Sequence, residues 1–278
     1  ASRRRRDHVD HHQRVTSEPT CFRHPDRVTY ILCHRCGNSI CTDCMIPAPV
    51  GFQCPDCVRS NRVLVLQDFV PRATYVIIAI CTVLQVLPWI GITTSNGFIY
   101  DFSLWPRAVA AGEYVRLFTA IFLHGGFLHL GMNMYMLMVL GRDLERALGR
   151  LRYVVLFLLS GLGGSAASYW FNAVDTPSVG ASGAIFGLFA AIFMFGRERG
   201  LNTQNIVAVV GLNLLIGFLV PGIDWHAHVG GLLVGGIAGW ALLPQRVKSL
   251  QWLIPVVLFA AFCVAISVRT TALQGIFY

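Results

Sequence analysis

Seven long runs without a charged residue dominate this 278-residue chain and restrict what it can fold into. Each run is close to the roughly 20 apolar residues that a helix needs to cross a bilayer. Only 13% of the residues are charged, whereas a soluble domain carries about a quarter. The sequence therefore predicts an all-α polytopic membrane protein with spans at about 73–92, 117–140, 153–173, 179–196, 206–223, 225–243 and 251–268.

The positive charges predict how these spans are oriented. Eleven of the 22 Lys and Arg residues precede residue 73. Eight more fall in loops on the same predicted side as the N-terminus, against three on the other side. Because Lys and Arg accumulate in cytoplasmic loops, we expect a cell inner (plasma) membrane protein with a cytoplasmic N-terminus and an outside C-terminus. The net charge of +8 is thus an orientation signal, and no nucleic-acid partner is expected.

The second strong pattern is a set of four cysteine or histidine pairs within residues 21–57. Two residues separate the partners of every pair, a spacing typical of zinc-binding loops. Eight ligands suffice for two closed tetrahedral sites, and zinc would supply folding energy that so short a segment lacks. We therefore predict two structural zinc ions, with the ligands Cys21, His24, Cys33, Cys36, Cys41, Cys44, Cys54 and Cys57.

This segment resembles the B-box and related cross-braced zinc modules. The resemblance implies that the first and third pairs share one zinc ion and that the second and fourth pairs share the other. The spacing alone leaves open a sequential pairing, which would give two small zinc ribbons. Four disulfides would need an oxidising compartment, whereas the predicted topology places the module in the cytosol, where thiols stay reduced. The module could recruit a cytosolic partner, regulate the membrane domain or stabilise the N-terminus.

A serine and a histidine form the candidate catalytic pair. Ser182 opens the fourth run and His228 opens the sixth, and both runs start from the same predicted side of the membrane. A hydroxyl beside an imidazole makes an activated nucleophile, provided that the two helices pack closely. Small residues four apart permit such packing, and the two runs carry rows of this kind at Gly183, Gly187, Gly231 and Gly235.

The second run adds polar residues at its start. His129 and Asn133 are four residues apart and share one helical face, while His124 lies nearer the surface. In a run otherwise rich in Leu, Met and Phe, they are expected to face the protein interior. They are candidate donors to a developing oxyanion, together with the backbone N–H of Ser182 at a helix N-terminus. Hydrogen bonding between helices is the alternative role.

These motifs together resemble those of the rhomboid intramembrane serine proteases. The matching pieces are Gly180-x-Ser182-Gly183, Ala227-His228-x-x-Gly231-x-x-x-Gly235 and His124-x4-His129-x3-Asn133. Arg142 and Glu145, expected in the loop after the second span, also match the family pattern, and the resemblance covers residues 70–245.

The resemblance implies a fold and a mechanism. Ser182 would be the nucleophile and His228 its general base, while His129, Asn133 and the Ser182 amide would form the oxyanion hole. The fold would be a six-helix rhomboid core with the seventh span as an additional helix. The substrates would be single-span membrane proteins, cut in or near the lipid bilayer, and catalysis would need no cofactor.

The sequence departs from the family at one position and offers no third catalytic residue. Phe186, four residues after Ser182, replaces a frequent tyrosine, so an aromatic ring is kept and a hydroxyl is lost. Asp224, four residues before His228, is expected at the aqueous edge and solvated. We therefore predict a Ser–His dyad.

The predicted domain order is a basic tail at 1–20, the zinc module at 21–57 and a linker at 58–72. The protease core then covers 73–245, and 246–278 hold the additional helix and the C-terminus. Two alternatives to a protease are a catalytically inactive rhomboid-like membrane adaptor and a transporter. The transporter is disfavoured because such folds usually contain internal repeats, which this sequence lacks.

Overall fold

The computed structural model describes residues 18–48, 51–60, 69–88, 90–91, 95–244 and 247–277. The chain divides into two compact units, with the boundary between Phe69 and Val70. Most of the predicted basic tail, residues 1–17, and the central part of the predicted linker, residues 61–68, lie outside the described residues.

The N-terminal unit has little regular secondary structure. Strands β1 (Ile46–Pro47) and β2 (Phe52–Gln53) pair antiparallel, and helix α1 (Pro55–Ser60) follows. Its buried centre consists mainly of cysteines, six of them, together with Ile40. A segment of this size cannot bury enough apolar surface to fold on that basis alone, so the cysteines must provide much of its cohesion.

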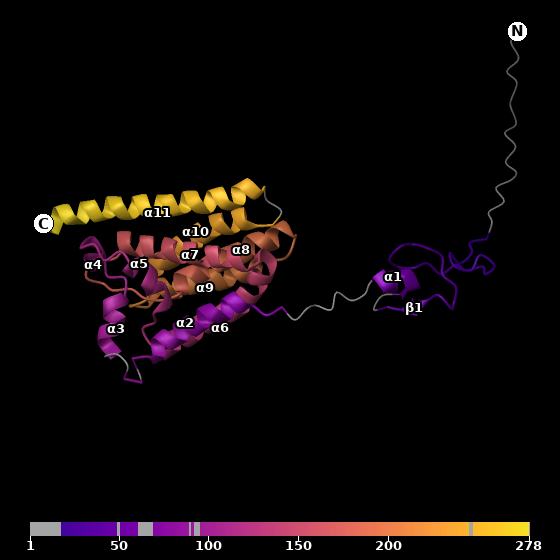
Figure 1. Ribbon diagram of the computed structural model, residues 1–278, viewed down its shortest axis with the longest axis horizontal. Coiled ribbons are helices and arrows are strands. Elements are labelled where there is room, and N and C mark those ends of the chain that lie inside the picture. The colour runs from indigo at the N-terminus through magenta and orange to yellow at the C-terminus, as the bar shows by residue number, and fades with distance from the viewer. Residues whose placement is uncertain are drawn as a thin grey trace, which may run out of the picture. The chain divides into compact units, whose positions relative to one another are not determined.

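The second unit is a bundle of long helices (Figure 1). Each of the seven predicted runs overlaps one of them, which confirms the helical fold. By length and apolarity alone, α7 and α11 could each cross a membrane, and a bent helix pair that includes α6 could add a third span. The long helices are α2 (Arg72–Val86), α6 (Phe127–Leu148), α7 (Arg150–Phe171), α8 (Ser182–Glu198), α9 (Gln204–Leu219), α10 (Trp225–Leu242) and α11 (Lys248–Phe277).

The second run differs from the prediction of one continuous span over 117–140. It starts as α5 (Arg116–Thr119) and the 3-10 turn η1 (Ala120–Phe122), which are bent by 85° from α6. The break contains Gly125 and Gly126, and adjacent glycines favour neither helix nor strand. His124 consequently lies before α6 and not within it.

The segment between the first and second runs contains two short helices, α3 (Ser95–Phe102) and α4 (Pro106–Ala110). The expectation that Arg142 and Glu145 lie in a loop was wrong. Helix α6 continues to Leu148, so Arg142 and Glu145 are helical and not in a loop. Glu145 is fully buried and accepts hydrogen bonds from the backbone N–H groups of Ala73 and Thr74 at 3.0 and 2.9 Å. It thereby satisfies N–H groups that the first turn of α2 leaves without helical partners.

Contacts between glycines hold α8 and α10 together. A Cβ atom added to Gly231 would lie 1.9 Å from the carbonyl oxygen of Gly183, and one added to Gly235 would lie 2.2 Å from the Cα of Gly187. Both positions are occupied by backbone, so nothing larger than hydrogen fits there. Gly187 also meets Ser160 of α7, where an added Cβ would be 2.1 Å from the hydroxyl oxygen. Three helices therefore pack with their backbones in near contact at the predicted glycine rows.

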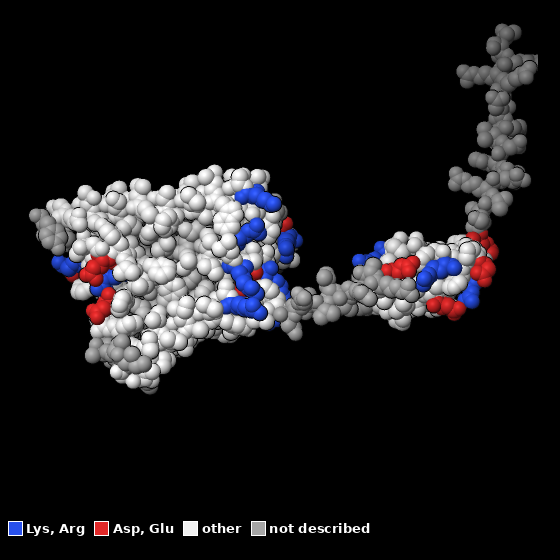
Figure 2. Space-filling model, viewed as in Figure 1, with Lys and Arg blue, Asp and Glu red and all other residues white. Residues whose placement is uncertain are grey.

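Basic side chains of the helical unit gather at one end, and few lie at the other (Figure 2). The end of α6, the start of α7, the end of α8 and the start of α11 supply basic residues of that cluster, among them Arg142, Arg146, Arg150, Arg152, Arg197, Arg199 and Lys248. The surface between the two ends exposes large apolar side chains, Leu128 at 79% and Tyr135 at 68% among them. An apolar belt beside a basic end is typical of an integral membrane protein.

Candidate functional site

The serine and histidine of the candidate dyad meet at the ends of two packed helices. Ser182 is the first residue of α8, and His228 lies in the first turn of α10. The Oγ of Ser182 and the Nε2 of His228 are 3.0 Å apart, which is hydrogen-bond distance. His228 is only 7% exposed. The arrangement places an imidazole nitrogen where it can accept the hydroxyl proton of Ser182.

Packing rather than a carboxylate orients the imidazole of His228. The Phe186 ring stacks on it, with centroids 4.3 Å apart and planes inclined by 13°. On the α9 side, a Cβ atom added to Gly217 would lie 3.2 Å from Nδ1. Within the described part of the chain, Nδ1 itself has no hydrogen-bond partner. Among the described residues no carboxylate thus bonds to the imidazole, and the Phe186 ring packs on it instead.

His129 faces the same site from the start of α6. Its Nδ1 accepts a hydrogen bond from the backbone N–H of Gly125 at 3.3 Å, so in the neutral ring Nε2 carries the proton. A Cβ atom added to Gly180 would lie 2.9 Å from this Nε2 and 3.6 Å from the Oγ of Ser182. Gly180 has φ +138°, which side-chain-bearing residues rarely adopt. Because Gly180 has no side chain, space remains between the Nε2–H of His129 and the Oγ of Ser182.

The structure places Asn133 and His124 around His129 rather than on Ser182. Asn133 is 6% exposed, and its Nδ2 donates to the carbonyl oxygen of His129 at 2.8 Å. His124 is fully buried, and its ring meets that of His129 edge-on with centroids 5.1 Å apart. Neither ring nitrogen of His124 has a hydrogen-bond partner among the described residues.

Asp224 is not the solvated residue that its sequence position suggested. Its side chain is 16% exposed, and its Oδ1 caps α10 by accepting from the N–H of Ala227 at 3.1 Å. Its Oδ2 accepts from the hydroxyls of Ser168 and Ser178 at 2.5 and 2.7 Å and from the amide of Asn172 at 2.9 Å. The local sequence around Asp224 does not indicate this role, because the three donors to Oδ2 lie 46 to 56 residues away along the chain.

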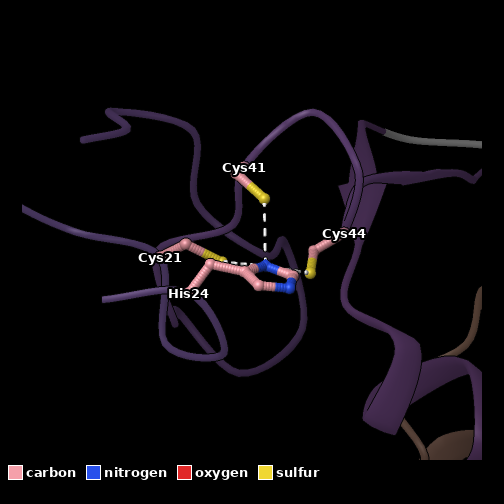
Figure 3. A group of neighbouring side chains, drawn as sticks. All are labelled: Cys21, His24, Cys41 and Cys44. Carbon is pink, nitrogen blue, oxygen red and sulfur yellow. Dashed lines mark hydrogen bonds between the residues drawn. The ribbon is translucent and has the colours of Figure 1, made fainter. Parts of the chain in front are cut away.

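The N-terminal unit brings its eight predicted ligands into two groups. One group contains Cys21, His24, Cys41 and Cys44 (Figure 3), and the other contains Cys33, Cys36, Cys54 and Cys57. In each group the ligand atoms lie within 4.8 Å of one another. The first group joins the first and third pairs, and the second group joins the second and fourth. This is the interleaved arrangement, and the sequential one is not found.

The distances in the first group fit a tetrahedral metal site. The Nδ1 of His24 lies 3.8 Å from the Sγ of Cys21 and 3.4 Å from the Sγ atoms of both Cys41 and Cys44 (Figure 3). Bonds of about 2.1 Å to nitrogen and 2.3 Å to sulfur would separate tetrahedral ligands by roughly 3.5–3.8 Å. Two groups of side chains in this unit could therefore each bind a metal ion.

The acidities of the thiols are consistent with such sites. Burial raises the pKa of Cys21, but hydrogen bonds from the backbone of Cys41 and Arg23 outweigh it and lower the pKa to about 6. In the same group, burial and the neighbouring thiols raise the pKa of Cys44 to about 11. The Cys21 thiol thus ionises readily. The Cys44 thiol resists ionisation, because it is buried and its negative charge would lie beside those of the neighbouring thiols. A bound cation would supply the balancing positive charge.

Comparisons with known proteins agree with this site. Residues 111–245 match the Rhomboid domain family. The rhomboid protease GluP of Bacillus subtilis (strain 168) is 36% identical over 214 residues, which are 74% of this chain and 42% of GluP. The RHOMBOID-like protein 5 of Arabidopsis thaliana is 41% identical over 145 residues, 49% of this chain and 47% of that protein.

These alignments cover less than half of the length of GluP and of the plant protein. A third relative is covered more fully: YdcA of Bacillus subtilis (strain 168), a candidate rhomboid protease, is 34% identical over 146 residues. That segment is 50% of this chain and 72% of YdcA. Together with the domain match, this coverage establishes that the chain belongs to the rhomboid family.

Proposed function

We propose that this chain is an intramembrane serine endopeptidase that cleaves single-span membrane proteins in or near the bilayer. The observation that carries the proposal is the 3.0 Å separation between the Oγ of Ser182 and the Nε2 of His228 at the start of two packed helices. The likeness to GluP, a rhomboid protease, supports the same reaction class. An ionisable residue within membrane helices is costly and by default has a function.

In the proposed reaction, the Oγ of Ser182 attacks the scissile carbonyl carbon while the Nε2 of His228 takes the hydroxyl proton. The tetrahedral oxyanion would lie near Gly180 and accept hydrogen bonds from the Nε2–H of His129 and the N–H of Ser182. Asn133 would contribute a further donor if its amide turned from the His129 carbonyl. His228 then returns the proton to the leaving amine, and water hydrolyses the acyl-enzyme.

Labelling with a fluorophosphonate probe tests this function against its two rivals. An activated serine attacks the probe irrespective of the natural substrate, whereas neither an inactive adaptor nor a transporter should react. We expect one adduct per chain in detergent micelles, which peptide mapping should place on Ser182. Absence of an adduct on the folded protein, or an adduct on another serine, would refute the proposal.

We expect His129→Ala to lower kcat by about 10²–10³-fold, because loss of one oxyanion donor has this effect in other serine proteases. Asn133→Ala should lower it by a smaller factor, since its amide donates to a carbonyl in the resting enzyme. Asn213→Ala is the matched control, because Asn213 of α9 donates to the carbonyl of Val209 in the same way at 2.8 Å. The measurement is cleavage of a single-span model substrate in proteoliposomes. Equal effects of Asn133→Ala and Asn213→Ala would remove Asn133 from the site.

We also propose that the metal in the N-terminal unit is zinc and that two ions are structural. Cysteine and histidine in closed four-ligand groups are typical of structural zinc. Elemental analysis should find two zinc ions per chain. The double variant Cys21→Ser/Cys41→Ser should lose one ion if pairing is interleaved, but both if it is sequential. Cys81→Ser, which alters a buried cysteine of α2, should lose none.

The domain boundaries and the topology are proposals of the same kind. The zinc module would occupy residues 21–57, the six-helix protease core 73–245 and the additional helix 246–278. The basic end of the helical unit (Figure 2) supports a cytoplasmic position for that end and for the N-terminus. Protease added outside intact cells should then leave the zinc module uncut. In the cytosol the zinc module could bind a cytosolic partner. Its cleavage in intact cells would reverse the proposed orientation.

A further inference from the structure

We propose that Asp224 is a positioning residue, which sets the relative placement of Ser182 and His228 by joining the chain before α8 to the start of α10. The inference rests on the proposed function, because it concerns how the dyad is held. The carboxylate of Asp224 does not touch the reacting atoms. The evidence is the set of donors that converge on it.

Asp224 connects three parts of the chain through one side chain. Ser168 and Asn172 belong to the end of α7, and Ser178 belongs to the loop between α7 and α8. The N–H of Ala227 belongs to the first turn of α10. Three of these four donors converge on Oδ2 and one donates to Oδ1, and the Nδ1 of His226 lies 3.9 Å from Oδ1. The hydrogen bonds to this carboxylate thus come from the scaffold, whereas the imidazole of His228 bonds to Ser182 through Nε2 and has no partner at Nδ1 among the described residues.

Ser182 and His228 each lie four residues along the chain from a partner in the hydrogen bond between Ser178 and Asp224. Ser178 precedes Ser182 by four residues, and Asp224 precedes His228 by four residues. Ser178 is also fixed from the other side, because its N–H and C=O pair with the backbone of Leu104 at 2.8 and 3.0 Å. A shift of Ser178 relative to Asp224 would therefore alter the separation between Oγ and Nε2. Misplacement by about 1 Å is enough to reduce a reaction rate by about 100-fold.

An alternative explanation is that Asp224 serves only as the N-cap of α10. Serine is as good an N-cap as aspartate, but its side chain is one atom shorter and has a single oxygen. It could therefore accept from the N–H of Ala227 while losing the link to Ser168, Asn172 and Ser178. The variants Asp224→Ser and Asp224→Ala thus separate capping from the connection between helices.

The test measures the rate of fluorophosphonate labelling and the kcat and KM for a single-span model substrate, with the full chain in proteoliposomes. Asp224→Ser is expected to lower both the labelling rate and kcat by about 10–100-fold, nearly as much as Asp224→Ala, with KM within about threefold. Asp175→Ala is the matched control, because Asp175 is an exposed acid of the loop between α7 and α8 and pairs with Arg107 at 2.7 Å. It should stay within about twofold of wild type. Wild-type rates for Asp224→Ser, with a loss confined to Asp224→Ala, would show that capping suffices and would overturn the proposal.

A second comparison applies if the Asp224 variants fail to fold. Ser178→Ala removes only one donor and leaves the cap of α10 intact, and it should lower the labelling rate by at least about threefold. Where Asp224→Ser does fold, adding Ser178→Ala to it should cause no further loss, because both substitutions break the same connection. A Ser178→Ala protein with the wild-type rate, or fully additive losses, would overturn the inference. A folded wild-type protein that is neither labelled nor active would instead refute the proposed function, and this inference with it.

Discussion

Ser182→Ala and His228→Ala are each expected to lower kcat by about 10⁴-fold or more while the protein remains folded. The alanine at position 182 has no nucleophilic oxygen, and without His228 nothing at 3.0 Å can take the hydroxyl proton. Because the two side chains act as one unit, the double variant should be no slower than the slower single variant. The measurement is cleavage of a reconstituted single-span substrate, followed by gel or mass spectrometry.

Two controls make this result interpretable. Ser267→Ala changes an exposed serine of α11 and should retain the wild-type rate. Thermal unfolding of all variants should show midpoints close to that of wild type, since neither dyad side chain fills a large part of the core. Residual activity of Ser182→Ala above a few per cent of wild type would mean that another group carries out the hydrolysis.

Gly231→Ala is expected to abolish most activity through packing, although it adds only one methyl group. The added Cβ would lie 1.9 Å from the carbonyl oxygen and 2.9 Å from the Cα of Gly183. Both atoms belong to the backbone, so α10 must move away from α8 and carry His228 from Ser182. We expect a loss of activity of about 100-fold and a destabilisation of about 1–3 kcal/mol.

Gly236→Ala provides the matched control on the same helix. Its added Cβ would lie 3.5 Å from the Cβ of Ala190, which is ordinary van der Waals contact. It should keep wild-type activity and leave the unfolding midpoint unchanged or slightly raised, because alanine favours helix over glycine. The readouts are substrate cleavage and thermal unfolding in the same detergent. If both glycine variants behaved alike, close contact between α8 and α10 would not be what holds the dyad together.

The sequence was a sound guide where a local property decides the outcome. Apolar runs predict membrane helices because hydrocarbon leaves the backbone no other hydrogen-bond partners, and α7 and α11 follow that rule. The cysteine spacing likewise predicted the eight side chains that gather into two candidate metal-binding groups, since ligands two residues apart can turn toward one ion. The family motifs named Ser182 and His228, which the structure places in contact.

The predictions failed where a residue's environment depends on distant parts of the chain. Asp224 was expected in water because it lies at the end of a span, but donors from α7 and the following loop enclose it. Glu145 was expected in a loop, but the start of α2 supplies the N–H groups that permit its burial. In both cases the partner is more than 40 residues away, and no local pattern in the chain indicates it.

What the sequence by itself determined is the helical membrane fold, the set of candidate metal ligands and the identity of the candidate catalytic side chains, because these follow from residue type and short spacing. Only the tertiary structure decided that a serine and a histidine 46 residues apart lie within hydrogen-bond distance. The physical reason is the contact between the glycine rows of α8 and α10. Hydrogen in place of a side chain lets two backbones touch, and their exact register depends on the whole bundle.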